Sequence, residues 1–418
     1  MLPATLFSRQ GHCVTSVLVF LFLTSLLSTE SGYTYALGLL SLYSLWSLPQ
    51  LSRIQLQRSE MWIMFWLLSF AVLGMLAAAI HADPLHTYEV PAKFALAAVL
   101  ILCCMKLPPK PVFFWVGLVA GAVSGLAVAY WKMLHAMEFK AYGYTGAIQF
   151  GNISLTLGVI LIVGLFWAIQ SRGERRGMWV SLLSFGAACG LLGSYFSGTR
   201  GGWVAIPVYI LAFCLAYLKR KNLGASLLIL VALIGTGVLI SQYSPMVQER
   251  IQAASQDVTE FQEHGLDSAG SVSSRLAIWG ASLDMLKDKP VWGWGEVLFR
   301  EELQRREQVG LIGSAPASLA NTHNTFIEVW IMYGGLALVA LIGLLISLMW
   351  HFLRSVRHAD LIERTYALAG LCLVLGYVVY SQTQIMLIRN NTLVFFLLMV
   401  AVLLALLRQR RLELTGEA

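Results

Sequence analysis

Twelve apolar runs, most of them long enough to cross a lipid bilayer, dominate the sequence. A transmembrane helix needs about 20 apolar residues to span the hydrocarbon core. The runs lie at about residues 13–29, 33–50, 61–81, 91–105, 112–131, 146–169, 178–196, 201–218, 223–242, 323–350, 365–387 and 392–407. This pattern predicts an all-α polytopic membrane protein with about 12 transmembrane helices.

The composition excludes the soluble alternatives. Charged residues make up 12% of the 418 residues and hydrophobic residues make up 58%, whereas a soluble domain carries about 25% charged residues. The mean hydropathy of +0.71 also excludes a disordered chain. The net charge of +7 fits basic residues that anchor cytoplasmic loops, so we expect membrane lipids as partners and no nucleic acid.

Basic residues alternate between the segments that join the runs. With the N-terminus in the cytoplasm, the inside segments hold 17 lysines and arginines and the short outside segments hold five. Because cytoplasmic loops are enriched in positive charge, both termini are predicted to be cytoplasmic. A cleaved signal peptide is the competing interpretation of the first run, but no A-x-A-like site follows it, so we expect a retained span.

The longest connection is an outside segment of 80 residues with eleven acidic and seven basic residues. A loop this long is usually functional or a small domain of its own. We therefore divide the chain into residues 1–242, which hold nine spans, the loop 243–322, and residues 323–418, which hold three spans and the cytoplasmic C-terminus. Helical periodicity predicts three loop helices, at Pro245–Gly265, Ser274–Lys287 and Glu296–Gln308.

Ionisable residues at membrane depth are costly, so their positions indicate function. The first such place is Ser197–Trp203, where almost no loop joins two runs and Arg200 is expected at the outer interface. Its neighbouring glycines allow close backbone approach and leave amide N–H groups for an anion. A guanidinium binds phosphate in a bidentate manner. The alternative is that Arg200 only reaches toward lipid headgroups.

The second place is Ser273-Ser274-Arg275, at the start of the amphipathic loop helix. Two serines before an apolar-periodic run are typical of a helix N-cap. A helix N-terminus with an arginine in its first turn attracts anions. An ordinary solvated arginine is the simpler alternative for Arg275.

The third place is the polar stretch Asn321–Phe326, which leads into the tenth run from the outer face. His323 is a candidate proton acceptor near neutral pH, and a histidine at a helix start is the alternative. Glu328 lies four residues after Asn324, so the two residues can share a helix face. We expect Glu328 to orient a partner or to pair with an arginine.

Weaker candidates lie in the other outside loops. Arg389 follows the eleventh run and adds a cation to the same face, although an interfacial anchor is an equal alternative. His81, Asp83 and His86 are metal-ligand residue types at irregular spacing, so no metal site is predicted there.

Arginines and one histidine without a carboxylate cluster suit a phosphate-bearing substrate and the removal of a proton from a hydroxyl.

The chain resembles the O-antigen ligase and polymerase superfamily of bacterial inner-membrane proteins. The resemblance covers about residues 190–345 and the layout of twelve spans with one large loop after the ninth. The residues that carry it are Gly198-Thr199-Arg200-Gly201-Gly202, Ser274-Arg275, Trp279, the run Lys289–Gly295, Thr322–Phe326 and Gly334-Gly335.

The O-antigen ligases are the most similar members. The resemblance implies transfer of a glycan from undecaprenyl-diphosphate-linked O-antigen to a hydroxyl of the lipid A–core oligosaccharide at the periplasmic face of the inner membrane. It also implies that Arg200 and Arg275 match the essential arginines of the family, that His323 matches its essential histidine, and that no metal or other cofactor takes part. In this mechanism the arginines neutralise the diphosphate leaving group and His323 accepts the hydroxyl proton, with inversion at the anomeric carbon.

Five further residues are candidates for binding the diphosphate or sugar: Thr199, Trp294, Asn321, Asn324 and Arg389. Trp294 can equally pack within the loop. Three other functions remain open. An O-antigen polymerase and a protein O-oligosaccharyltransferase share the donor and the motifs, although a polymerase often has more than one large outside loop and the oligosaccharyltransferases have an extra C-terminal domain. A lipid-linked glycan transporter is disfavoured, because its ionisable groups would lie at mid-membrane.

Overall fold

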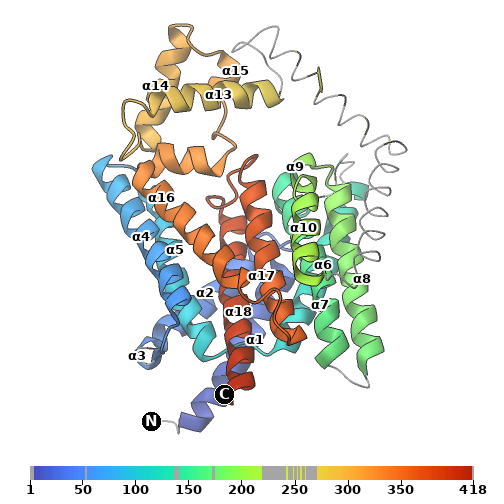
Figure 1. Cartoon of the computed structure of the whole chain (residues 1–418). Coiled ribbons are helices and arrows are strands. Elements are labelled where there is room, and N and C mark those ends of the chain that lie inside the picture. The colour runs from blue at the N-terminus through green and yellow to red at the C-terminus, as the bar shows by residue number, and fades with distance from the viewer. Residues whose placement is uncertain are drawn as a thin grey trace.

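The computed structural model describes residues 4–51, 54–135, 140, 142–171, 175–218 and 271–416, with a few single positions between 219 and 270. All regular structure in this part of the chain is helical (Figure 1). The elements are α1 (Ala4–Ser25), α2 (Gly32–Trp46), α3 (Leu48–Leu51), α4 (Arg58–Ile80), η1 (Leu85–Tyr88), α5 (Glu89–Lys106), α6 (Pro111–His135), α7 (Ala147–Ser171), α8 (Arg176–Phe196), α9 (Arg200–Trp203), α10 (Ile206–Tyr217), α13 (Ser271–Met285), α14 (Glu296–Gln308), α15 (Ser314–Ala317), α16 (Thr325–Leu353), α17 (Leu361–Tyr380) and α18 (Asn390–Thr415).

Eight of the described helices are long and apolar enough to cross a membrane. They confirm that the chain is an all-helical, multi-pass membrane protein. Eleven of the twelve predicted runs fall on described helices. The ninth run, at 223–242, lies outside the described residues, so the count of twelve spans stays a prediction.

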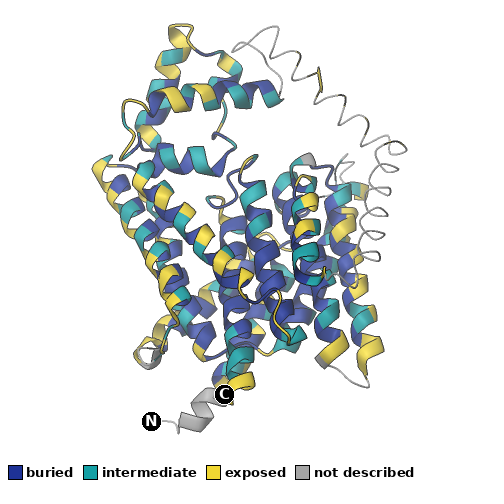
Figure 2. Ribbon diagram, in the orientation of Figure 1, coloured by how far each residue is buried: buried dark blue, intermediate teal, exposed yellow. Residues whose placement is uncertain are grey.

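The helices form a bundle with α18 near its centre (Figure 1). In the most apolar stretch of α18, 89% of the residues are buried. In the most apolar stretches of α4 and α8, 44% of the residues are buried. Figure 2 shows the same gradient, with exposed residues along the outer faces of the peripheral helices. The exposed side chains of α4 include Phe65, Leu68 and Val72. Apolar side chains on the outside of a bundle suit contact with lipid rather than with water.

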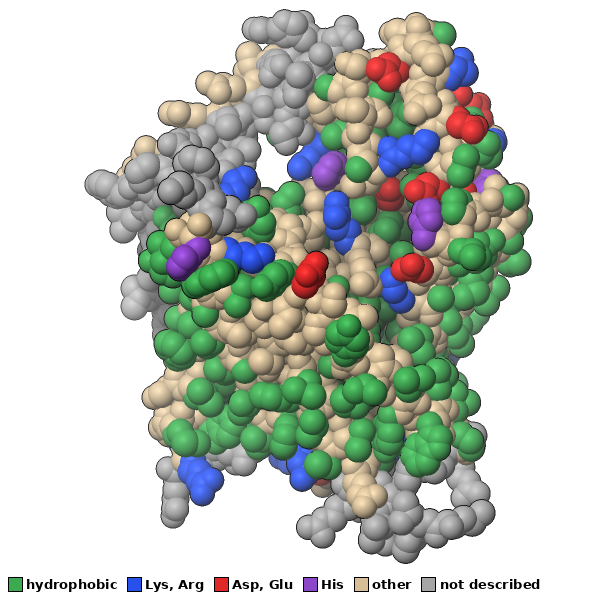
Figure 3. Space-filling model, turned by 180° about the vertical axis from the view of Figure 1, so that it is seen from behind, with side chains coloured by type: hydrophobic (Ala, Val, Ile, Leu, Met, Phe, Trp, Pro, Cys, Tyr) green, Lys and Arg blue, Asp and Glu red, His purple; other side chains and the backbone are tan. Residues whose placement is uncertain are grey.

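Charged side chains are concentrated toward the two ends of the bundle. Figure 3 shows hydrophobic side chains around its middle and most Lys, Arg, Asp, Glu and His side chains above or below them. Both termini lie at one end, and α13, α14 and α15 form a layer at the opposite end (Figure 1). The reaction-site candidates from the sequence belong to the end that carries this layer.

Two predicted spans are interrupted in ways that hydropathy does not indicate. The run 365–387 is helical only to Tyr380, and the segment from Ser381 to Arg389 forms turns, here called the return segment. Its apolar residues Ile385, Met386 and Leu387 are buried without being helical. The run 201–218 is divided at residues 204–205 into the short α9 and the longer α10, which has proline near its start.

The loop helices agree with the predictions in part. The helix predicted at Glu296–Gln308 is confirmed with the same bounds by α14. The helix at Ser274–Lys287 is confirmed as α13, but it already runs at Ser271, so the prediction that Ser273 and Ser274 cap its start was wrong. The helix predicted at Pro245–Gly265 falls on a segment that lies almost wholly outside the described residues.

Candidate active site

A polar turn at residues 321–325, here called the His323 turn, leads into α16 and includes its first residue, Thr325. The Asn324 side chain accepts hydrogen bonds from the backbone N–H groups of Phe326 and Ile327, at 2.9 and 3.2 Å, and so caps the helix. The Asn321 side chain accepts from the His323 backbone N–H at 3.0 Å. Both candidate asparagines therefore fix the backbone on either side of His323.

The backbone of His323 has an unusual conformation. Its φ angle is +53°, in the left-handed region that few non-glycine residues adopt. Such conformations persist only where the surroundings enforce them, and they cluster at functional sites. The imidazole is partly buried, and no group of the described residues donates to or accepts from its Nδ1 atom. The turn therefore holds a buried ring nitrogen that has no hydrogen-bond partner among the described residues.

Glu328 and Trp279 hold the His323 turn from two sides. The buried Glu328 carboxylate accepts the Thr322 backbone N–H at 2.7 Å. The indole N–H of Trp279, on α13, donates to the Thr322 carbonyl at 2.6 Å. Among the described residues Glu328 forms no ion pair with an arginine, so it orients the turn rather than a cation. The Trp279 bond fixes α13, and with it Arg275, beside the turn.

The return segment lies against the other side of the turn. Thr325 donates from its backbone N–H to the Ser381 carbonyl at 2.8 Å and from its hydroxyl to the Gln384 carbonyl at 2.9 Å. The Asn324 amide donates to the Gln382 carbonyl at 3.3 Å. The segment that ends at Arg389 is thus bonded directly to the turn that carries His323.

The glycine-rich motif around α9 packs onto the same return segment. A Cβ atom on Gly201 would lie 2.9 Å from the Thr383 hydroxyl, so glycine permits this close approach. The buried Thr199 hydroxyl lies 2.8 Å from that of Ser197 and so bonds within the motif, and Thr199 is the residue that precedes α9. Arg200 is the first residue of α9. The backbone of Arg200 therefore lies next to Gly201, the residue that contacts the return segment.

The electrostatic surroundings keep His323 neutral. Burial, followed by the positive charges of Arg275 and Arg389, lowers the pKa of His323 to about 4, although the nearby Gln384 side chain opposes part of this shift. An imidazole with this pKa is neutral at physiological pH, which is the state that a proton acceptor requires. The charges of Arg275 and Arg389 contribute to this lowering of the pKa, so both arginines lie near enough to the ring to act on it electrostatically.

A cavity of about 520 Å³ opens beside Arg389. Its polar lining includes Glu30, Tyr33, Tyr144, Gln149 and Arg389, which come from loops and from the first turns of α2 and α7. With its amide oriented to satisfy both neighbours, Gln149 accepts from the Arg389 guanidinium at 3.2 Å. Arg389 therefore points into a polar cavity and not only toward the membrane surface.

The loop is attached to α16 at a joint formed by residues 290–295 and 330–335. Gly334 interrupts α16 with a φ angle of +86°. The interruption frees the Ile331 carbonyl, which accepts a hydrogen bond from the Trp294 backbone N–H at 2.7 Å. It also frees the Gly335 backbone N–H, which donates to the Pro290 carbonyl at 3.0 Å. The Trp294 indole donates to the Met285 carbonyl at 2.8 Å. Trp294 therefore ties α13 to the joint, which favours its packing role over sugar binding.

The loop between α4 and η1 makes a second attachment, which the sequence did not reveal. Asp83 accepts the backbone N–H of Glu296 at 3.1 Å, at the start of α14. His86 pairs with the Glu296 carboxylate at 2.7 Å, and His81 lies 3.0 Å from the Trp292 carbonyl. His81, Asp83 and His86, the residues with metal-ligand side chains, thus hold the loop 243–322 against the bundle. Within the described residues, no group of three or more His, Cys, Asp and Glu side chains could hold a metal ion.

Residues 185–342 match the family model described as O-antigen ligase. This region is similar to the O-antigen ligase family. The match spans α9, α13, the joint and the His323 turn, which are the elements that the structure assembles at one end of the bundle. The chain is also 23% identical to an uncharacterized protein of Haemophilus influenzae over an alignment of 389 residues. The alignment covers 91% of this chain and 95% of that protein.

The region that matches the family model contains all but one of the predicted site residues; Arg389 lies outside it. Arg275, His323 and Arg389 converge electrostatically, Asn321 and Asn324 shape the turn, and Thr199 starts α9 next to the return segment. Trp294 belongs to the joint. The sequence named Trp279 as a motif residue but did not predict its bond to the turn, and it did not identify Gln384, because both contacts are formed only in the tertiary structure.

Proposed function

We propose that the protein is a metal-independent glycosyltransferase that moves O-antigen glycan from undecaprenyl diphosphate to a hydroxyl of the lipid A–core oligosaccharide. The observation that carries this proposal is the neutral imidazole of His323, with an unpaired Nδ1, beside the charges of Arg275 and Arg389. A proton acceptor next to fixed cations suits an alcohol nucleophile and a diphosphate leaving group.

The chemical step follows from this arrangement. The acceptor oxygen forms a bond to the anomeric carbon of the donor, its proton passes to His323, and the bond from the anomeric carbon to the diphosphate oxygen breaks with its electron pair on the diphosphate. Attack from the face opposite the leaving group inverts the anomeric centre. Positioned general-base catalysis contributes typically about 10²–10⁴-fold to the rate.

The arginines supply the second contribution. A leaving diphosphate develops negative charge, and preorganised cations in a partly buried site stabilise that charge. We assign this role to Arg275 and Arg200. The cavity beside Arg389 adds a cation and several hydrogen-bonding groups, and we assign to it a part of the diphosphate or the adjoining sugar. These assignments place substrate between the return segment, α9 and α13.

The location of the site fits a lipid-linked donor. The cluster lies at the end of the bundle opposite both termini (Figure 1), where the polyprenyl chain can stay in the membrane while its diphosphate reaches the arginines. With cytoplasmic termini, as the distribution of basic residues predicts, this end faces the periplasm of a bacterial inner membrane.

Reconstitution tests the proposal. Purified protein is incubated with undecaprenyl-diphosphate-linked glycan and rough lipopolysaccharide, with and without a metal chelator, and the products are separated by size. We expect glycan on lipid A–core in both conditions. Longer lipid-linked glycan without transfer to lipopolysaccharide would show a polymerase, transfer to a supplied protein acceptor would show a protein glycosyltransferase, and loss of product with the chelator would overturn metal independence.

A further inference from the structure

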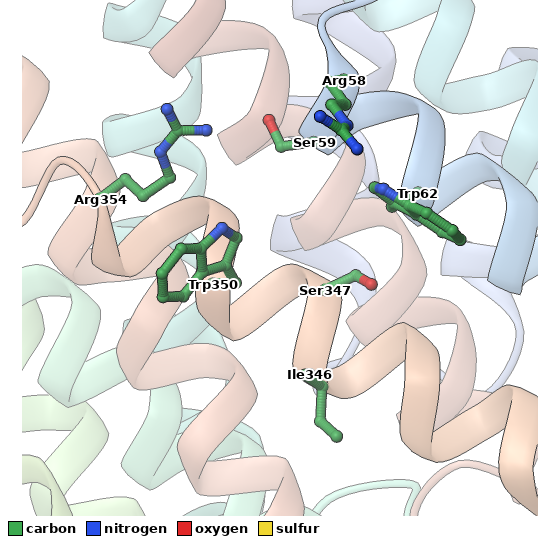
Figure 4. A pocket seen from close by; sticks show the side chains of 7 residues that line it. All are labelled: Arg58, Ser59, Trp62, Ile346, Ser347, Trp350 and Arg354. Atoms are coloured by element: carbon green, nitrogen blue, oxygen red, sulfur yellow. The ribbon is translucent and has the colours of Figure 1, made fainter.

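The end of the bundle that carries the termini has a groove between α4 and α16 (Figure 4). The two helices pack side by side, and at Gly343 they come so close that a Cβ atom would lie 2.5 Å from the Trp66 ring. Beyond this contact they leave a cavity of about 650 Å³. Because it lies far along both helices from the His323 turn, which precedes α16, the proposed transferase site does not include it.

Two arginines flank the groove. Arg58 begins α4 and Arg354 follows the last residue of α16, and Figure 4 shows both guanidinium groups directed toward the space beside Ser59. No carboxylate of the described residues pairs with Arg58 or Arg354. The nearby arginines of α18, in contrast, are matched with acids: Arg408 with Glu60, Arg410 with Asp360 and Arg411 with Glu363. The groove therefore keeps a positive charge, whereas the charges of these three α18 arginines are neutralised.

The other lining groups give the groove an amphipathic character. Trp62 and Trp350 are both exposed, at 48% and 59%, and tryptophan favours the boundary between lipid and water. Figure 4 places the Trp350 indole nitrogen on the side of Ser59 and Arg354, and Ile346 farther along the helix. Cationic donors thus stand at one end of the groove and exposed apolar surface at the other.

We propose that this groove is a binding site for one anionic phospholipid of the leaflet that faces the termini. The lipid phosphate lies between Arg58 and Arg354, because guanidinium groups bind phosphate through paired, charge-assisted hydrogen bonds. The acyl chains run along Ile346 and the outer faces of α4 and α16 toward the middle of the membrane. Two unneutralised cations select an anionic headgroup over a zwitterionic one.

Native mass spectrometry of the full chain tests the proposal. The protein is equilibrated in detergent with equal amounts of phosphatidylglycerol and phosphatidylethanolamine, and the retained lipids are counted. We expect the wild type to retain phosphatidylglycerol preferentially. The double variant Arg58→Gln/Arg354→Gln should lower this retention about tenfold or more, because it removes both guanidinium groups that form charge-assisted hydrogen bonds to the lipid phosphate. Both side chains are exposed and without ion pairs among the described residues, so the fold should persist, which size-exclusion chromatography and circular dichroism verify.

A matched control removes the same charge elsewhere. Arg175 and Arg176 are exposed at the connection between α7 and α8, and Arg175→Gln/Arg176→Gln should leave the retention within about twofold of wild type, since nonspecific surface charge contributes little at a distance. Equal loss in both double variants, or equal retention of the two lipids by the wild type, would overturn a specific site. Inorganic phosphate that displaces the lipid at millimolar concentration would show an ion site and would also overturn it.

Discussion

Replacing Gly334 with alanine should detach the loop from α16 and thereby abolish transfer. Gly334 has a φ angle of +86°, and a Cβ atom there would lie 2.1 Å from the Val291 carbonyl oxygen and 2.6 Å from backbone atoms of Trp292. No flexible side chain can yield, because the obstructing atoms belong to the backbone. The segment 290–295 must therefore move away, and it carries α13 and Arg275 with it.

The magnitude follows from two contributions. A non-glycine residue in the left-handed region costs about 1–2 kcal/mol. Opening the joint also removes three backbone hydrogen bonds, two to the Ile331 carbonyl and one from the Gly335 N–H, which contribute about 0.5–1.5 kcal/mol each. The two contributions add to about 2.5–6.5 kcal/mol of lost stability relative to the closed wild-type joint. The collision with the Val291 carbonyl, which the closed joint cannot relieve, drives the loop away from α16.

Gly310→Ala is the matched control. Gly310 also has a positive φ angle, of +72°, but no atom lies within 4 Å of the position that its Cβ atom would take, so this variant carries the strain without the collision. We expect Gly334→Ala to insert into membranes at normal levels, to be cut faster by trypsin after Arg305 or Arg306, and to lose transfer, while Gly310→Ala behaves nearly as wild type. Equal behaviour of the two variants would refute the role of the joint.

Three further predictions concern the His323 turn. The kcat/KM of transfer should stay level from pH 8 to about pH 5 and fall as the pH approaches about 4, where His323 becomes protonated; a fall centred near pH 6.5 would contradict the lowered pKa. Arg275→Lys keeps the charge but loses the bidentate geometry, so kcat/KM should drop more than about tenfold; near-wild-type transfer would make Arg275 a bystander. Glu328→Gln keeps an acceptor for the Thr322 N–H and should retain transfer, whereas Glu328→Leu leaves that buried group unsatisfied, at about 1–3 kcal/mol, and should lose it; equal activity of both would show that the carboxylate does not hold the turn.

Much of the architecture could be predicted from hydropathy, because a helix that crosses a membrane needs a continuous apolar run. The exceptions have physical reasons. The return segment buries Ile385, Met386 and Leu387 without forming a helix. Three carbonyl groups that precede them, those of Ser381, Gln382 and Gln384, bond to the His323 turn instead of to a following helical turn. The start of α13 was misplaced because Ser273 and Ser274 are buried within the helix, where their capping propensity is not used.

The candidate site could be predicted as residue types but not as a geometry. The sequence shows an arginine and a histidine in polar outside motifs, and their chemistry suggests a diphosphate and a proton acceptor. It cannot show that Trp279 bonds to the Thr322 carbonyl, nor that Gln384 lies beside the His323 ring. These contacts join residues far apart along the chain, so only the packing of the helices reveals them.

The most direct test of the account is the transfer rate of His323→Ala in the reconstituted system, measured together with binding of the lipid-linked donor. The exposed His135, at the end of α6, provides the control variant His135→Ala. We predict that His323→Ala loses about 10²–10⁴-fold in rate, as expected for removal of a general base, while donor binding and protein level stay near those of wild type and of His135→Ala. Full transfer by His323→Ala would contradict the central claim that this imidazole accepts the proton of the acceptor hydroxyl.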